Sequence, residues 1–168
     1  MESRAKFLGH AIHPILIVFP LGLLATAVVF DIIYLIWGSR DMASVAYWMM
    51  AAGIIGGLIA APFGLIDWLA VPSGTRAKTI GLMHGGSNVI ALLFFAGSWW
   101  LRNDLPERPE TLASILSFIG AGMAGVGGWL GGELVERLGV GVHEGANLDA
   151  PSSLSNASTG SNAPTGRA

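Results

Sequence analysis

Four long apolar stretches constrain the fold of this chain more than any other feature of its sequence. They cover Ile15–Trp37, Ala43–Leu69, Thr79–Leu101 and Leu112–Leu138. Each is longer than the roughly 20 residues that a helix needs to cross a hydrocarbon core of about 30 Å. Only 12% of the residues are charged, about half the share in an ordinary soluble domain. The sequence therefore predicts an all-α fold with four transmembrane helices.

The connections between these stretches are short and rich in turn-forming residues. They lie at 38–41, 71–76 and 102–109 and contain glycine, proline and charged residues. Short connections make neighbouring helices antiparallel, so residues 1–146 are expected to form a four-helix antiparallel transmembrane bundle. Residues 147–168 are mostly Ser, Asn, Ala, Gly, Thr and Pro. Such a segment buries too little apolar surface to offset the entropy of ordering, and we expect a disordered polar tail.

The aromatic and basic residues support a multi-pass membrane protein. In the antiparallel arrangement the six tryptophans fall into two interfacial belts, with Trp68 and Trp129 on one face and the other four on the opposite face. The face with both termini carries five basic residues near the spans, against three on the other face. The positive-inside rule then predicts that both termini are cytoplasmic.

Several classes of function are excluded or unsupported by composition. The chain has no cysteine, which excludes disulfides, thiolate metal sites, cysteine-held iron–sulfur clusters and covalently attached haem within it. The net charge of -2 gives no basic surface for nucleic acid. No motif of a hydrolase, transferase or nucleotide-binding enzyme is present, so an enzymatic role is left open and a redox carrier remains under consideration.

Ionisable residues inside membrane spans are costly and usually face the interior of a bundle. Antiparallel helices bring the starts of the first and third spans to the same face as the ends of the second and fourth. The ionisable residues expected near that face are His10, His13, Asp67, His84, Glu133 and His143. Asp31 is expected to stand alone near the opposite face. All four histidines are therefore predicted to lie on one side of the membrane.

Haem binding is the first hypothesis for this histidine cluster. His84 is flanked by Gly81, Gly85 and Gly86, and small neighbours leave room for a porphyrin beside a neutral imidazole. We expect His84 and His13 to be the axial ligands of a haem b in a small electron-transfer protein, with His10 as the alternative to His13. Pro14 disfavours helical geometry at the residue before it, which leaves the direction of the His13 ring open.

Two other hypotheses remain at this point. The first is a haem-free metal or proton site, because histidine and carboxylate side chains are ligands that Zn, Mn or Fe accept. Its candidate ligands are His10, His13, His84, Asp67 and Glu133. The second is a non-catalytic membrane scaffold or accessory subunit, in which recurrent small-x-x-x-small spacings serve helix packing alone.

Residues 5–145 resemble the bacterial four-helix membrane proteins of domain-of-unknown-function family 2231 (DUF2231). The segments that carry the resemblance are Gly9–Pro14, Gly64–Trp68, His84 with Asn88, and Gly131–Val135. The resemblance implies a multi-pass protein of the bacterial inner (cytoplasmic) membrane, and it implies no established catalytic residues. Relatives of this kind occur joined to Rieske-type iron–sulfur or c-type cytochrome domains, which implies a setting in membrane electron transfer. Here such a redox partner would be a separate protein, and the chain itself is a candidate homo-oligomer.

Overall fold

The computed structural model describes residues 1–155. Two short strands, β1 (Lys6–Phe7) and β2 (His10–Ala11), precede the helices. The helices are α1 (Ile12–Leu16), α2 (Val18–Trp37), α3 (Arg40–Ala70), α4 (Arg76–Leu101) and α5 (Thr111–Gly132), which continues as a π-helix at Glu133–Arg137. The sequence predicted each long helix to within a few residues at either end.

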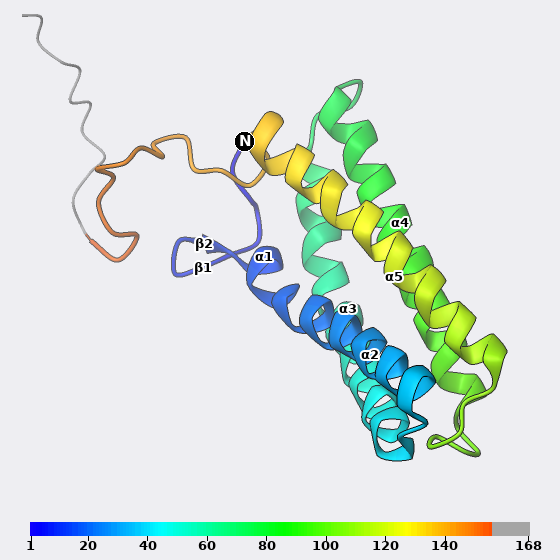
Figure 1. The fold of residues 1–168 in the computed structure, drawn as a ribbon. Coiled ribbons are helices and arrows are strands. Elements are labelled where there is room, and N and C mark those ends of the chain that lie inside the picture. The colour runs from blue at the N-terminus through cyan, green and yellow to red at the C-terminus, as the bar shows by residue number, and fades with distance from the viewer. Residues whose placement is uncertain (156–168) are drawn as a thin grey trace, which may run out of the picture.

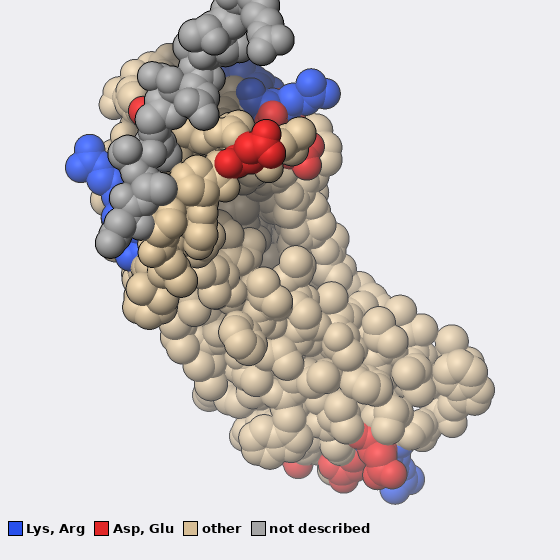
Figure 2. All heavy atoms as spheres, turned by 90° about the vertical axis from the view of Figure 1, so that its left-hand side faces the viewer, with Lys and Arg blue, Asp and Glu red and all other residues tan. Residues whose placement is uncertain are grey.

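Four helical segments of the described chain are long and apolar enough to cross a membrane. They are Ile12–Trp37, which combines α1 and α2, and Arg40–Ala70, Arg76–Leu101 and Thr111–Arg137. Successive segments run in opposite directions between two ends of the molecule (Figure 1). On the face drawn in Figure 2, charged side chains gather at these two ends and an uncharged band separates them. The predicted all-α antiparallel transmembrane bundle is confirmed.

Local sequence explains where the helices begin and end. Gly38 ends α2 in a left-handed conformation (φ 67°) that favours glycine, and its N–H donates to the Tyr34 carbonyl at 2.8 Å. Thr75 is the N-cap of α4: its hydroxyl accepts a hydrogen bond from the Lys78 N–H at 3.1 Å. Both residues lie in connections that the sequence marked as turns.

The N-terminal hairpin was not predicted. Strands β1 and β2 pair antiparallel, with Phe7 opposite His10. The turn between them holds Leu8 (φ 49°) and Gly9 (φ 84°) in left-handed conformations. His10 is therefore in extended backbone, while His13 lies in α1, so the two histidines belong to different elements.

The helices pack as two hairpins, α2 with α3 and α4 with α5, and contacts between the hairpins are fewer. The apolar core lies between them in the half of the bundle away from the N-terminus. Its fully packed members are Leu24, Ala27, Ala46, Met50 and Phe95. The half that holds α1 contributes no member to this core cluster within the described chain.

The predicted polar tail overlaps the described chain only at residues 147–155. There, hydrogen bonds between residues two apart in the sequence form turns. The Asp149 N–H donates to Asn147 Oδ1 at 2.9 Å, and the Leu154 N–H donates to Ser152 Oγ at 3.3 Å. The remainder of the predicted tail lies outside the described residues.

Candidate metal centre between His13 and His84

The His13 side chain is held between α1 and α3. Its Nδ1 lies 3.1 Å from the carbonyl oxygen of Ala60. Because a carbonyl oxygen can only accept a hydrogen bond, Nδ1 carries the proton and Nε2 of the neutral ring keeps its lone pair. Gly64 permits this position, since a Cβ there would lie only 2.8 Å from His13 Cε1. The ring is thus seated against the backbone of α3.

His84 makes the same arrangement with α5. Its Nδ1 lies 2.8 Å from the carbonyl oxygen of Gly127, so this ring also carries its proton on Nδ1 and its lone pair on Nε2. A Cβ at Gly131 would lie 3.1 Å from His84 Cε1. Asn88, one turn further along α4, donates to the His84 carbonyl at 2.8 Å and its amide nitrogen lies 3.4 Å from both ring nitrogens. Asn88 also occupies the space beside Gly127.

The two imidazoles come from different helix hairpins and lie close together. Their ring centroids are 6.4 Å apart and their planes are nearly perpendicular, at 86°. Two imidazoles on opposite sides of one metal ion, each with a metal–nitrogen distance of about 2.0 Å, have centroids about 6.3 Å apart. Metal-bound histidines usually donate their second ring N–H to a carbonyl or carboxylate, as both rings do here. The separation of the two centroids is the one expected for two ligands of a single metal ion.

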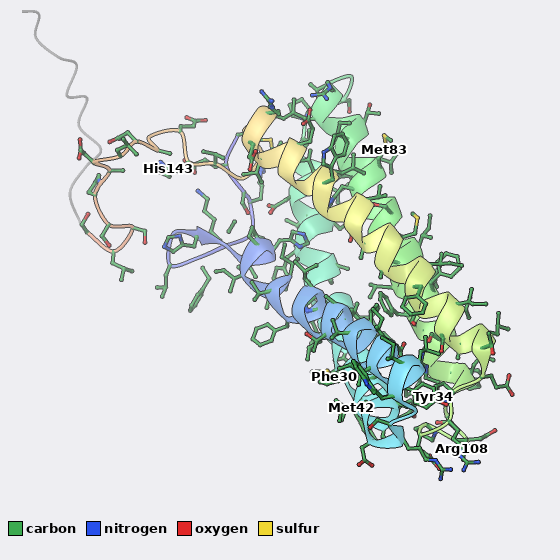
Figure 3. All side chains as sticks on the ribbon, in the orientation of Figure 1. Phe30, Tyr34, Met42, Met83, Arg108 and His143 are labelled. Carbon is green, nitrogen blue, oxygen red and sulfur yellow. The ribbon has the colours of Figure 1, made fainter. Side chains whose placement is uncertain are left out.

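The other two histidines lie away from this pair. His10 is exposed on β2, and its Nε2 lies 3.1 Å from the Ser153 hydroxyl. His143 is exposed in the segment after the helices (Figure 3), where its Nε2 lies 3.3 Å from a Glu2 carboxylate oxygen. Of the three histidines proposed for a cofactor, the structure thus brings together His13 and His84 and leaves His10 outside.

The carboxylates Asp67 and Glu133 have other partners. Asp67 accepts hydrogen bonds from the Ser3 hydroxyl (2.8 Å) and from the backbone N–H groups of Arg4 (2.7 Å) and Ala5 (3.3 Å). It ties the N-terminal segment to the end of α3. Glu133 forms an ion pair with Arg76 at 2.6 Å.

The five candidate metal ligands therefore do not converge. In residues 1–155 no three His, Asp or Glu side chains are placed to hold one metal ion. The physical reason is that backbone groups, which the sequence pattern does not reveal, bind these side chains instead. The Arg4 N–H in the N-terminal segment donates to Asp67, and the Gly127 carbonyl accepts from His84, so the two side chains do not share a partner.

A buried ion pair at the opposite end was missed. Asp31 is not alone: Arg102 Nη1 and Nη2 donate to its two carboxylate oxygens at 2.6 and 2.8 Å, and the Ser117 hydroxyl donates at 2.7 Å. All three residues are fully buried, at 0% exposure. The signal was present in the sequence, because the antiparallel order places the end of the third span beside the end of the first. Arg102 begins the connection at 102–109, for which the sequence predicts a place at the membrane surface, but the structure buries its side chain completely.

Comparison with known protein families agrees with this architecture. Residues 9–144 match the family described as "Predicted membrane protein (DUF2231)". The chain belongs to this family. The match spans β2, all the membrane helices and both His13 and His84, and it confirms the resemblance seen in the sequence. No curated protein and no solved structure matches the chain.

Proposed function

We propose that His13 and His84 are the axial ligands of a haem b and that the protein carries electrons within the membrane. The observation that carries this proposal is the 6.4 Å separation of the two imidazole centroids, together with the carbonyl oxygen that orients each ring through Nδ1. Both features are those expected of nitrogen ligands on opposite sides of one iron atom.

The small number of protein ligands favours haem over a bare metal ion. A structural zinc site needs four protein ligands, and a catalytic one needs three. The described residues supply two histidines and no third ligand beside them. Haem iron needs only one or two, because the porphyrin provides the other four nitrogens. The absence of cysteine means that such a haem would be held without covalent attachment.

The glycines beside His84 do not provide room for a flat group: Gly85 and Gly86 are exposed on α4, and a Cβ at Gly81 would lie 2.6 Å from Trp68 Cδ1. Support for such a group comes instead from the packing of the two halves of the bundle. The space-filling surface is hollowed in the half of the bundle that holds the N-terminus (Figure 2). The compact apolar core lies in the opposite half. Room for a porphyrin is therefore expected on this side of the bundle.

Two histidine ligands would occupy both axial positions of the iron. Such a haem supplies one-electron reduction and oxidation, and leaves no open position for a substrate. The roles of the chain are then to orient each imidazole through the Ala60 and Gly127 carbonyls, which accept from Nδ1 and leave Nε2 for the iron, and to fix the separation of the two rings. This favours electron transfer over catalysis, with a separate iron–sulfur protein or cytochrome as redox partner.

The orientation that we propose for the protein in the membrane rests on its basic residues. The end of the bundle with the N-terminus and the histidine pair carries five basic residues, Arg4, Lys6, Arg76, Lys78 and Arg137. By the positive-inside rule this end would be the cytoplasmic one. The haem would then lie near the cytoplasmic face of the inner membrane. Reporter fusions at the two termini test this orientation, since an active periplasmic reporter at either terminus contradicts it.

A reduced-minus-oxidised visible spectrum tests the proposed function. We expect detergent-purified protein, expressed with a haem supply, to give a sharp low-spin b-type signal. His84→Ala and His13→Ala should each remove the low-spin signal, while the matched controls His10→Ala and His143→Ala, which change exposed histidines, should retain it.

Two results would overturn the haem proposal. One is haem-free protein that contains a stoichiometric metal lost on His84→Ala, which would indicate a haem-free metal site. The other is folded protein with neither haem nor metal, in which case the histidine pair serves packing and the accessory-subunit hypothesis is correct.

A further inference from the structure

A second polar feature lies at the end of the bundle opposite the histidine pair. A cavity of about 390 Å³ opens there between the end of α2, the start of α3 and the loop before α5. Its lining residues are Tyr34, Leu35, Gly38, Arg40 and Arg108. Tyr34 and Arg108 are seen at this end in Figure 3. Two arginines and one tyrosine from three separate parts of the chain thus line one opening.

These donors are not used by the protein itself. Within residues 1–155, Arg40 and Arg108 form no ion pair, and the Tyr34 hydroxyl makes no hydrogen bond. Both arginines are exposed. The third arginine of this end, Arg102, is completely buried on Asp31. The cavity therefore presents hydrogen-bond donors and positive charge with no acceptor from the described chain.

The cavity also lies at the depth of a membrane interface. Three tryptophans at the same end are among the most exposed large side chains: Trp37 (71%), Trp48 (68%) and Trp100 (74%). Tryptophan belts mark the headgroup level of a bilayer. Leu35, which is 55% exposed, forms an apolar wall of the cavity on its membrane side. A lipid phosphate and the start of an acyl chain would meet matching groups here.

Nearby carboxylates distinguish a lipid from a free anion. This end of the bundle also carries four carboxylates, which outnumber the two unpaired arginines: Asp41, Asp104, Glu107 and Glu110. Their field disfavours the approach of a dissolved anion. A lipid phosphate is held at the interface by its acyl chains, so its concentration beside the arginines is set by membrane partitioning and exceeds that of a dissolved anion in the same field.

We propose that Arg40, Arg108 and Tyr34 form a binding site for the phosphate group of an anionic phospholipid. Arginine binds phosphate through parallel N–H donors, and the phenol hydroxyl supplies a further donor. This site is independent of the proposed haem, because it lies on the other side of the membrane and shares no residue with it.

Titration of short-chain phosphatidylglycerol into the full chain in detergent, followed by native mass spectrometry, tests the site. Arg40→Gln and Arg108→Gln should each weaken binding about fivefold, and the double variant about twenty-five-fold, from roughly 1 kcal/mol for each interfacial arginine. Tyr34→Phe should weaken it about twofold to fivefold, as the loss of one hydrogen bond predicts. The matched control is Arg137→Gln, an exposed arginine at the other end, and it should bind like the unchanged protein.

The same titrations contain the results that would overturn the site. Equal binding of phosphatidylcholine and phosphatidylglycerol would show that the negative headgroup is not recognised. Displacement of the lipid by inorganic phosphate would identify a free-anion site. Unchanged binding in a double variant with an unaltered melting temperature would exclude the arginines. If that variant does not fold, unchanged binding by Tyr34→Phe overturns the proposal.

Discussion

At one end of the bundle both oxygens of the buried Asp31 carboxylate are hydrogen-bonded to Arg102 and Ser117, whereas at the other end His13 and His84 each have one ring nitrogen hydrogen-bonded to a backbone carbonyl. In the first cluster Arg102 Nε is buried without a hydrogen-bond partner among the described residues. The carboxylate oxygens of Asp31 accept three hydrogen bonds in full burial. His13 Nε2 has no hydrogen bond within the described chain, and His84 Nε2 has only the Asn88 amide, at 3.4 Å.

This difference separates a structural polar cluster from a candidate functional one. A buried ion pair reinforced by a further hydrogen bond holds charged groups inside a membrane protein, and its complete burial closes it to a ligand. An imidazole that is oriented by one nitrogen and open at the other can take a ligand. The closed cluster also connects α2 with α4 and α5, and so joins the two hairpins at the end away from the histidines.

The largest expected effect is at the closed cluster. Asp31→Ala should reduce the free energy of unfolding by about 3–5 kcal/mol, because it leaves the Arg102 guanidinium buried without its carboxylate. The double variant Asp31→Leu with Arg102→Met should recover most of this loss, since it removes both charges. Thermal unfolding in detergent measures both effects. An Asp31→Ala variant as stable as the unchanged protein would show that the cluster is not a structural clamp.

An intermediate effect is expected where α3 meets the histidine ring. Gly64→Ala should lower the free energy of unfolding by about 1–3 kcal/mol and shift the His13 ring, because its Cβ would lie 2.8 Å from Cε1. Gly128→Ala is the matched control: no atom lies within 4 Å of its Cβ position, and helix propensity alone predicts a gain of up to about 1 kcal/mol.

The two glycine variants separate packing from ligation. If the proposed haem is present, Gly64→Ala should weaken its low-spin signal and Gly128→Ala should not. Equal loss of stability in both variants would contradict the assignment of Gly64 to the seat of the His13 ring.

A smaller and more local effect is expected at Asp67. Asp67→Ala should weaken the attachment of residues 3–5 by about 1–2 kcal/mol, because the Arg4 and Ala5 N–H groups lose their acceptor. Amide hydrogen exchange at these two residues measures it directly. Asp41→Ala, which removes an exposed carboxylate at the other end, is the control. Unchanged exchange at Arg4 would show that Asp67 does not hold the segment.

The smallest effect is a pH dependence at the exposed edge of the N-terminal segment. A hydrogen bond from the Lys6 ammonium, and a second from the Glu144 N–H, hold the pKa of Glu2 below its usual range. Because the folded value is the lower one, the contact stabilises the folded state above the unfolded pKa of about 4.3 and is lost as pH falls through the folded value.

Exchange of the Glu144 amide checks this dependence. Its protection should fall as the pH is lowered from about 5 to below the folded pKa of Glu2, and Glu2→Gln should remove the dependence on pH over that interval. Protection that stays constant in the unchanged protein would contradict the role of the carboxylate.

Much of the architecture could be predicted from sequence because bilayer thickness and hydropathy act on contiguous residues. The four spans, their antiparallel order and the family resemblance needed only runs of apolar residues, turn residues and motifs such as Gly64–Trp68. The pairing of His13 with His84 was also among the sequence hypotheses. This pairing could be proposed from the sequence because both residues lie near the start of a span, and the first and third spans start on the same side of the membrane.

The sequence by itself determined the membrane bundle and the side on which the histidines lie. Only the tertiary structure decided which polar groups meet. It paired Asp31 with Arg102, attached Asp67 to the N-terminal backbone, and placed His10 in a hairpin away from His13. These choices depend on backbone N–H and carbonyl groups, which every residue carries and no sequence pattern marks. They also depend on glycines such as Gly64, where the close approach becomes visible only once the helices are packed.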